Sequence, residues 1–151
     1  MTVRLGLKHD DADAKEKLKA AKKRGKDAMR AATFLRAQDL MDAALKLVPV
    51  RTGALRDSRY VKRSWPVKAA FAMRYASPVH ERHVEHGAGQ RKFLEIPLLR
   101  MTGEGVSSLA RYFQTAWDNQ WTLRNAPHRH PLRPGAAMRK GRSGRPRGAA
   151  K

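Results

Sequence analysis

The sequence predicts an α+β fold, in which a small, mostly antiparallel sheet is flanked by a long N-terminal helix and a C-terminal amphipathic helix. Residues 12–48 contain no proline and are rich in the strong helix formers Ala, Lys and Leu. Two segments on either side of residues 64–66 have strand-like composition. Residues 103–121 repeat apolar side chains at helical spacing. A length of 151 residues supports one domain with a modest core.

The N-terminal region combines a strand pattern with the start of a helix. Residues 3–7 alternate apolar side chains with polar ones or glycine, which is typical of a short half-buried strand. The acidic residues of "HDDAD" suit a helix N-terminus. The helix is expected over about 12–48, as one helix or as two nearly collinear ones with a break near Gly25. Pro49 ends it, because proline clashes with the preceding helical turn.

The middle of the chain predicts a hairpin followed by a short helix. Residues 54–65 and 67–76 are expected to be two strands joined at a turn. A short helix is expected to begin at Ser77, acting as the N-cap, and to stop at Gly87. The apolar segment at 92–99 contains Pro97, so we expect an extended segment or a short turn there.

The C-terminal part is predicted to be a helix followed by a basic extension. Residues 103–121 form an amphipathic helix whose apolar face carries aromatic rings. After this helix the composition changes, and residues 124–151 hold nine Lys or Arg and no acid. Such a composition is typical of a solvated, flexible tail. We therefore expect an α+β domain over residues 1–123 and a basic, Pro/Gly-rich extension over residues 124–151.

The charge of the chain indicates what kind of partner it binds, and its lack of cysteine excludes some kinds of site. The chain has 33 Lys and Arg against 13 Asp and Glu, a formal net charge of +20. This excess predicts a polyanionic neighbour, which can be nucleic acid, an anionic membrane or an acidic protein surface. The absence of cysteine excludes disulfides and thiolate metal sites. Because no apolar run approaches the ~20 residues that span a bilayer, we expect no membrane partner.

The segment "HERHVEH" resembles a zinc-binding motif and therefore raises the question of whether the protein is a metalloenzyme. It begins like the His-Glu-x-x-His zinc motif, but Val84 stands where the second histidine belongs. His80, His83 and His86 follow one another at three-residue spacing, which on a helix spreads the rings over ~120°. That spread is too wide for one tetrahedral ion. We therefore predict surface or interface histidines and no metal site.

Other catalytic motifs are missing from the sequence. It contains no nucleophile elbow, no phosphate-binding Walker loop and no dinucleotide fingerprint. We expect no enzymatic activity, no catalytic residue and no cofactor. The basic segments at 15–26 and 138–151 leave non-specific nucleic-acid binding as an alternative function, beside docking on an acidic protein. The candidate contacts with DNA or an acidic partner are Arg139, Lys140, Arg142, Arg145 and Arg147.

Three segments in a fixed order carry a resemblance to a known family. They are "LVPVRTGALRDS" at 47–58, "YASPVHE" at 75–81 and "KFLEIPL" at 92–98. With the long helix before them and the last helix after them, they resemble the neck or tail-completion proteins of tailed bacteriophages, which are minor tail or minor capsid components. The resemblance covers roughly residues 3–121. The signature positions are Pro49, Thr52, Gly53, Leu55, Arg56, Tyr75, His80, Glu81, Phe93 and Leu94.

The signature residues have a structural interpretation. Leu55 is expected to start a strand facing the core, while Tyr75 and Phe93 are expected to be buried anchors worth ~1.5–3 kcal/mol each. We expect Glu81 to pair with a basic residue of another element or subunit, and Arg51 or Arg56 are the candidates. The short helix and the loop after it would then lie at a subunit contact.

The resemblance implies a virion structural protein made in the host cytoplasm. Its members form a ring of identical subunits in the neck, between the head connector and the tail. The implied partners are other copies of the chain, the adjacent connector or stopper protein, and a tail terminator or tail-tube protein. The basic extension lies outside the resemblance, and we expect it to contact either packaged DNA or neighbouring subunits.

Overall fold

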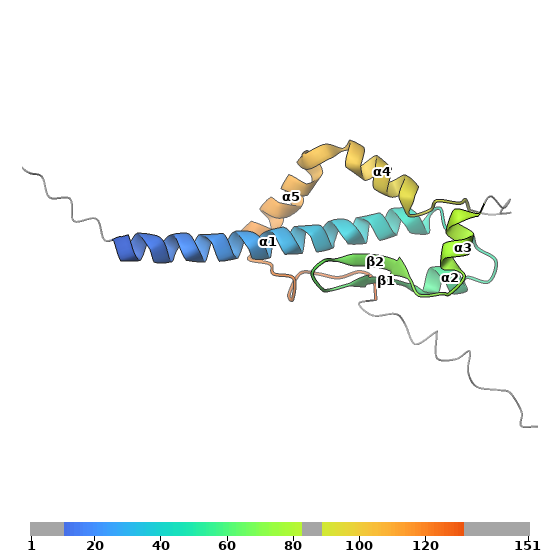
Figure 1. Ribbon diagram of the computed structural model, residues 1–151, viewed down its shortest axis with the longest axis horizontal. Helices are drawn as coiled ribbons and strands as arrows, with labels where there is room; N and C mark the ends of the chain where they lie inside the picture. The colour runs from blue at the N-terminus through green and yellow to red at the C-terminus, as the bar shows by residue number, and fades with distance from the viewer. Residues whose placement is uncertain (1–10, 83–88, 132–151) are drawn as a thin grey trace, which may run out of the picture.

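The computed structural model describes residues 11–82 and 89–131. The elements in chain order are α1 (Asp11–Leu45), α2 (Ala54–Asp57), β1 (Arg59–Lys62), β2 (Lys68–Phe71), α3 (Ala76–Glu81), α4 (Glu95–Gly103) and α5 (Gly105–Asp118) (Figure 1). A long N-terminal helix, a small antiparallel sheet and further helices make this an α+β fold, as predicted. The strand predicted at residues 3–7 lies outside the described residues.

The helix α1 is the longest element, and β1, β2, α4 and α5 pack along it. It runs for 35 residues without interruption, a length of about 52 Å at 1.5 Å per residue. Gly25 does not break it; a Cβ there would make an ordinary contact 3.8 Å from the Trp117 ring, so neither space nor backbone conformation requires a glycine at this position. The α4–α5 pair lies on one side of α1 and the β-hairpin lies on the other (Figure 1).

The predicted hairpin is present, but it is shorter than expected. β1 and β2 pair antiparallel, with Tyr60 opposite Ala70. The residues before β1 form the helical turn α2 instead of a strand, so the strand predicted to start at Leu55 is wrong. The physical reason is local: Gly53 adopts φ 77°, and its carbonyl accepts a 3.0 Å hydrogen bond from the Asp57 amide. Leu55 is nevertheless buried.

Two other boundaries differ from the sequence-based expectation. Segment 95–103 is the helix α4, although Pro97 predicted an extended segment or short turn. Pro97 is the third residue of this helix, within the first turn, where proline is tolerated because the first N–H groups of a helix have no partner inside it. The helix α3 begins at Ala76, and Tyr75 rather than Ser77 occupies the N-cap position.

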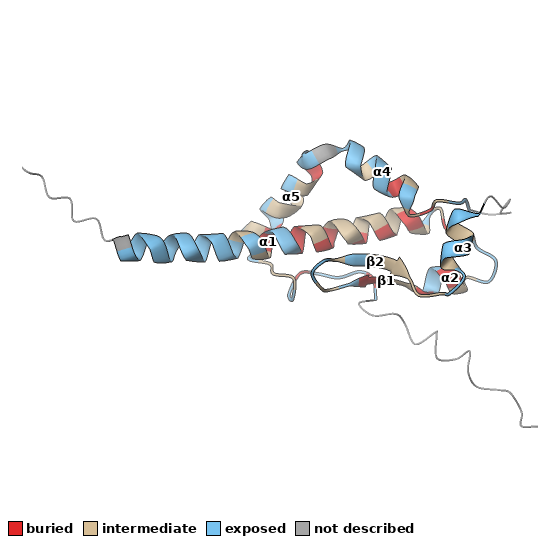
Figure 2. Cartoon of the chain, in the orientation of Figure 1, coloured by how far each residue is buried: buried red, intermediate tan, exposed pale blue. Residues whose placement is uncertain are grey.

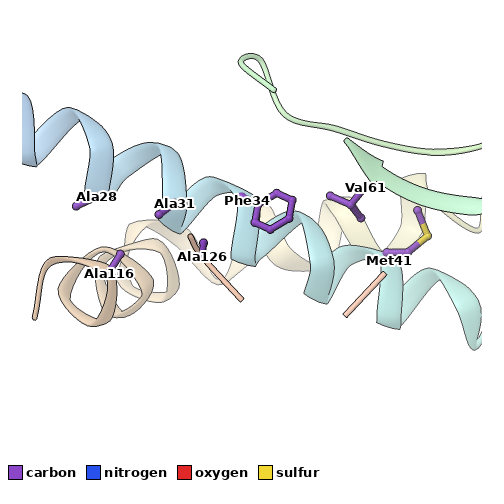
Figure 3. Close-up of a cluster of buried hydrophobic side chains, with 7 residues drawn as sticks. All are labelled: Ala28, Ala31, Phe34, Met41, Val61, Ala116 and Ala126. Carbon is purple, nitrogen blue, oxygen red and sulfur yellow. The ribbon is translucent and has the colours of Figure 1, made fainter. Parts of the chain in front are cut away.

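The main core lies along α1. Small residues of α1 meet α5, and larger ones fill the space toward the hairpin (Figure 3). The buried members are Ala28, Ala31, Phe34, Met41, Val61, Ala116 and Ala126. In Figure 2, the buried positions of α1 lie in its C-terminal part, while its N-terminal part is exposed throughout. Arg36 adds a polar link by donating a hydrogen bond to the Met101 carbonyl of α4.

The first residues of the basic extension pack against the body. Ala126 is 1% exposed and His130 is 5% exposed, so residues 124–131 are attached to the body rather than a free tail, although the other residues of this segment are exposed. Arg63, next to β1, donates hydrogen bonds to the carbonyls of Arg124 and Ala126. These backbone acceptors carry no sequence pattern, which is why composition alone predicted a tail. Residues 132–151 lie outside the described part of the chain.

Candidate functional site

The three signature segments come together at one end of the molecule. There the chain leaves α1, forms α2 and α3, and returns through residues 89–94 to α4 (Figure 1). A second buried cluster joins them, with Val48, Leu55 and Phe93 as its buried members. The partly buried residues around it are Leu47, Phe71, Met73, Ala76, Val79 and Leu94. Each segment contributes at least one of these residues, so the signature describes one packed unit.

Phe93 is the centre of this cluster. Its ring is 1% exposed and meets Phe71 edge-on at 5.3 Å and His80 at 4.7 Å between ring centroids. The expectation of a buried anchor is therefore confirmed for Phe93. For Tyr75 it is wrong, because that side chain is 44% exposed.

The register of α3 explains the exposure of Tyr75. The helix begins one residue after it, and Ala76 and Val79 are the α3 residues that contact the cluster. Their spacing of three places both on the same face of the helix. Tyr75 stands before the first turn and remains at the surface of this end.

An ion-pair network links α3 to the start of α4. The Lys92 ammonium lies 2.8 Å from Oε2 of Glu81 and 2.7 Å from Oε2 of Glu95. The hydrogen bond from Lys92 lowers the pKa of Glu81, and the same bond raises the pKa of Lys92. Glu81 thus pairs with a basic residue of another element, as expected, but within the subunit that residue is Lys92 rather than Arg51 or Arg56, because the return segment passes beside α3.

The return segment is held by its backbone. Lys92 has φ 56°, and its amide donates a 2.9 Å hydrogen bond to the His80 carbonyl. Gly89 has φ +87°, and a Cβ at this position would lie 2.5 Å from the backbone of Pro49. The amide of Gln90 donates to the Leu47 carbonyl at 2.8 Å. The return segment thus contacts both the first and the second signature segments through its backbone.

His80 has a packing role at this site. Its side chain is 14% exposed and stacks edge-on against Phe93. Nδ1 lies 3.3 Å from Oε1 of Glu81, but the two atoms lack hydrogen-bond geometry. His83 and His86 lie outside the described residues. Within residues 11–82 and 89–131, no group of three or more His, Cys, Asp or Glu is arranged to hold a metal ion.

The remaining signature residues divide into a structural set and an exposed set. Pro49 and Gly53 are half-buried and shape the turn after α1, and Leu94 borders the buried cluster. Thr52, Arg56 and Glu81 are exposed at this end of the molecule. The cluster thus holds the fold together beneath a polar surface that also bears Tyr75 and Val50, both 44% exposed.

A second polar cluster, which the sequence did not reveal, holds the C-terminal segment on α1. The Gln38 side chain is fully buried; Nε2 donates to the Pro127 carbonyl at 2.9 Å, and Oε1 accepts from the Arg129 amide. The Arg129 guanidinium pairs with Asp39 and Asp42, and the Asp39 contact raises the pKa of Arg129. The only signal was the polar stripe 38, 39 and 42 on a helix otherwise apolar there.

The basic residues predicted to contact DNA or an acidic partner lie outside the described residues. Arg139, Lys140, Arg142, Arg145 and Arg147 all belong to residues 132–151. In the part of the chain that the structure describes, no helix has the length and hydropathy needed to cross a membrane. The two polar clusters, one around Lys92 and one around Gln38 and Arg129, bind protein segments to one another, and they contain no arrangement of nucleophile and base.

Comparison with known proteins supports the resemblance. The model of the HK97-gp10-like family, described as "Bacteriophage HK97-gp10, putative tail-component", matches residues 12–89. This match spans α1 through α3 and includes the first two signature segments. No curated protein and no solved structure gives a match. Because the family match covers more than half of the chain, this protein belongs to the HK97-gp10-like family of bacteriophage tail components.

Proposed function

We propose that this chain is a subunit of a homo-oligomeric ring in the neck of a tailed phage, where it joins the head connector to the tail. The family assignment supports a structural protein of the virion. Position in the neck and assembly as a ring go beyond that assignment. They rest on the order of the signature segments and on the surface described below.

The observation that carries the ring proposal is the exposed apolar surface of α4 and α5. Leu98 is 48%, Leu99 62% and Val106 80% exposed. These residues lie along the arch that α4 and α5 form on one side of α1 (Figure 1). Exposed large apolar side chains grouped on one region mark protein interfaces, because they gain free energy when a partner removes them from water. A second copy of the chain is the partner that a closed ring requires.

The exposed signature residues supply a second contact surface. Thr52, Arg56, Tyr75 and Glu81 are all exposed in the segments that follow the C-terminal end of α1. In the proposed assembly this polar end faces the adjacent connector or stopper protein, or the tail terminator or tail-tube protein. Such a subunit acts by binding, so we propose no enzymatic activity and no cofactor. The chain is made in the host cytoplasm and is incorporated into the virion there.

Deletion of the gene tests the joining role. We expect lysates with DNA-filled heads and separate tails that do not join, counted by electron microscopy. Normal particles in the absence of the protein would overturn the proposal. Expression of the wild-type chain from a plasmid should restore joined particles.

Charge substitutions test the ring surface. Leu99→Glu combined with Val106→Glu places carboxylates on the arch, and we expect loss of the oligomer in light-scattering and mass measurements. Leu18→Glu is the control for a carboxylate at an exposed apolar position, because Leu18 is 55% exposed and lies on α1 away from the arch; Leu99→Glu alone is compared with it directly. If the arch variant assembles as well as the control, this surface is not the subunit contact.

A further inference from the structure

We propose that the N-terminal part of α1 binds the phosphate backbone of a nucleic acid duplex. The surface consists of residues 12–26 and is called here the basic arm. This inference goes beyond the proposed ring, because it assigns a polyanionic ligand to a part of the chain that the apolar arch and the signature end do not use.

The basic arm carries an excess of one sign of charge. It contains seven cations and only two carboxylates, Asp13 and Glu16. The cations are Lys15, Lys17, Lys19, Lys22, Lys23, Arg24 and Lys26. A solvated helix gains from opposite charges four residues apart, whereas like charges at this spacing repel. The sequence places lysines four apart repeatedly, as at Lys15 and Lys19. This pattern weakens the free helix and favours a bound anion.

The arm projects into solvent. Every residue from 12 to 24 is exposed, and the rest of the described chain first covers α1 at Gly25 and Ala28. These 13 residues extend about 20 Å beyond the body at 1.5 Å per residue (Figures 1 and 2). Arg24 marks the base of the arm, where its guanidinium lies 4.5 Å from the centre of the Trp117 ring and donates to the Trp117 carbonyl.

The cations of the arm are concentrated on one side of the helix. Five of the arm's seven cations line one shallow hollow on this side. The residues that line it are Lys15, Leu18, Lys19, Lys22, Lys23, Lys26, Asp27 and Arg30. Their spacing of three and four residues forms a stripe about 22 Å long. Phosphates of a duplex follow one another every 3.4 Å of axis on each strand, so a stripe of this length spans several of them.

The chemistry of the stripe favours duplex nucleic acid over a protein. Protein interfaces are enriched in aromatic residues and depleted of lysine, whereas Leu18 is the one large apolar residue of the basic arm. The arm also lacks the repeated apolar seam of a coiled coil.

Single strands and base readout are disfavoured for the same reason. Proteins that hold single strands stack bases on aromatic rings, and the basic arm, residues 12–26, contains no aromatic residue. The exposed Trp65 ring lies beside Arg30, beyond the arm. Lysine acts as a flexible point charge that contacts phosphates without reading base sequence. We therefore expect binding that is independent of sequence and strongly dependent on salt.

Two full-length variants with equal charge test the proposal. Each replaces five cations by glutamine and so lowers the formal net charge of +20 by five. Glutamine keeps the helix propensity of lysine. The arm variant is K15Q/K19Q/K22Q/K23Q/K26Q. The control changes exposed cations of other segments and is K46Q/K62Q/K68Q/R91Q/R111Q. Circular dichroism confirms that both fold.

The readout is fluorescence anisotropy with a labelled DNA duplex of about 20 base pairs over a series of salt concentrations. We expect the arm variant to lose at least about tenfold in affinity at ~100 mM salt, and its plot of log K against log salt to become shallower by about three. The control variant should lose less than about threefold in affinity for the duplex, because the charges that it removes lie far from the bound phosphates and are screened by salt.

Three results would overturn the proposal. Equal losses in both variants would mean that net charge alone governs binding. Tighter binding to a single strand of the same length would show that the ligand is single-stranded and not a duplex. Stronger arm-dependent binding to polyglutamate or to anionic phosphatidylserine vesicles would assign a protein or a membrane surface instead. The assay is independent of the ring, because a failure to assemble leaves duplex binding by the subunit measurable, and the arm variant should still assemble.

Discussion

The ammonium of Lys92 lies 2.8 Å from Glu81 and joins α3 to the segment that leads into α4. This contact connects the second and third signature segments, through two residues that are 11 positions apart in sequence. Both groups are partly exposed, at 33% and 59%, so the pair contributes modestly to stability. Its main effect is to fix the position of the return segment beside α3.

The first prediction concerns pH. The pKa of Glu81 is lowered from its usual 4.5 by the Lys92 hydrogen bond, so the folded state favours the ionised carboxylate. The pair therefore stabilises the fold above about pH 4.5, and this contribution is lost as the pH falls through the folded pKa. The pKa of Lys92 is raised from 10.5, so its contribution to stability is fully present below about pH 10.5 and is lost as the pH rises through the higher pKa of the folded state. Glu81→Gln should lower the urea midpoint at neutral pH, and this difference should shrink in acid.

The control for this pH effect is Glu104→Gln. Glu104 is an exposed carboxylate at the α4–α5 junction. Its substitution should change the urea midpoint little at either pH. A deficit of the Glu81 variant that is equally large at neutral and acid pH would show that the ion pair is not its cause.

The second prediction concerns the aromatic centre of the signature end. Phe93→Ala removes a ring that is 1% exposed and leaves a cavity against Phe71 and His80. We expect the free energy of unfolding to fall by about 3–5 kcal/mol, measured by urea denaturation. Leu18→Ala, at a position 55% exposed and outside the proposed ring surface, should change it by less than about 0.5 kcal/mol. A loss below about 1 kcal/mol for the Phe93 variant would contradict the packing described.

The third prediction compares two glycines. Gly89→Ala places a Cβ 2.5 Å from the Pro49 backbone at φ +87°. We expect a loss of at least about 2 kcal/mol in the free energy of unfolding, because both the backbone conformation and the contact disfavour a side chain. Gly103→Ala, with no atom within 4 Å of the new Cβ, should be neutral or stabilising by up to about 1 kcal/mol. Equal effects of the two substitutions would refute the close approach.

The fourth prediction tests the attachment of the C-terminal segment. Gln38→Leu keeps the side-chain size but removes the hydrogen bonds to the Pro127 carbonyl and the Arg129 amide. We expect a loss of about 1–3 kcal/mol in thermal unfolding, with faster hydrogen exchange at the Arg129 amide. Gln114→Leu changes an exposed glutamine of α5 and should stay within about 0.5 kcal/mol of the wild type. Unchanged exchange at Arg129 would show that other contacts hold the segment.

The candidate site was predictable in its members but only partly in its arrangement. The signature segments identified Leu55 and Phe93, both of which are buried in one cluster. Within the subunit two expectations were wrong: Glu81 pairs with Lys92 rather than with Arg51 or Arg56, and Tyr75 is exposed rather than buried. Each error arose because the register of α3 and the path of the return segment depend on contacts between segments. The segment's own periodicity does not encode such contacts.

The sequence by itself determined the elements whose signal is local. Helix propensity and the absence of proline specify α1, an aromatic amphipathic pattern specifies α5, and strand-like composition around a turn specifies the hairpin. Tertiary structure decided the rest. Gln38 and Arg129 are 91 residues apart, and α1 must already be in place before its buried amide can hold the C-terminal segment. A contact of this kind depends on where two segments meet in space, and no repeat along the chain records it.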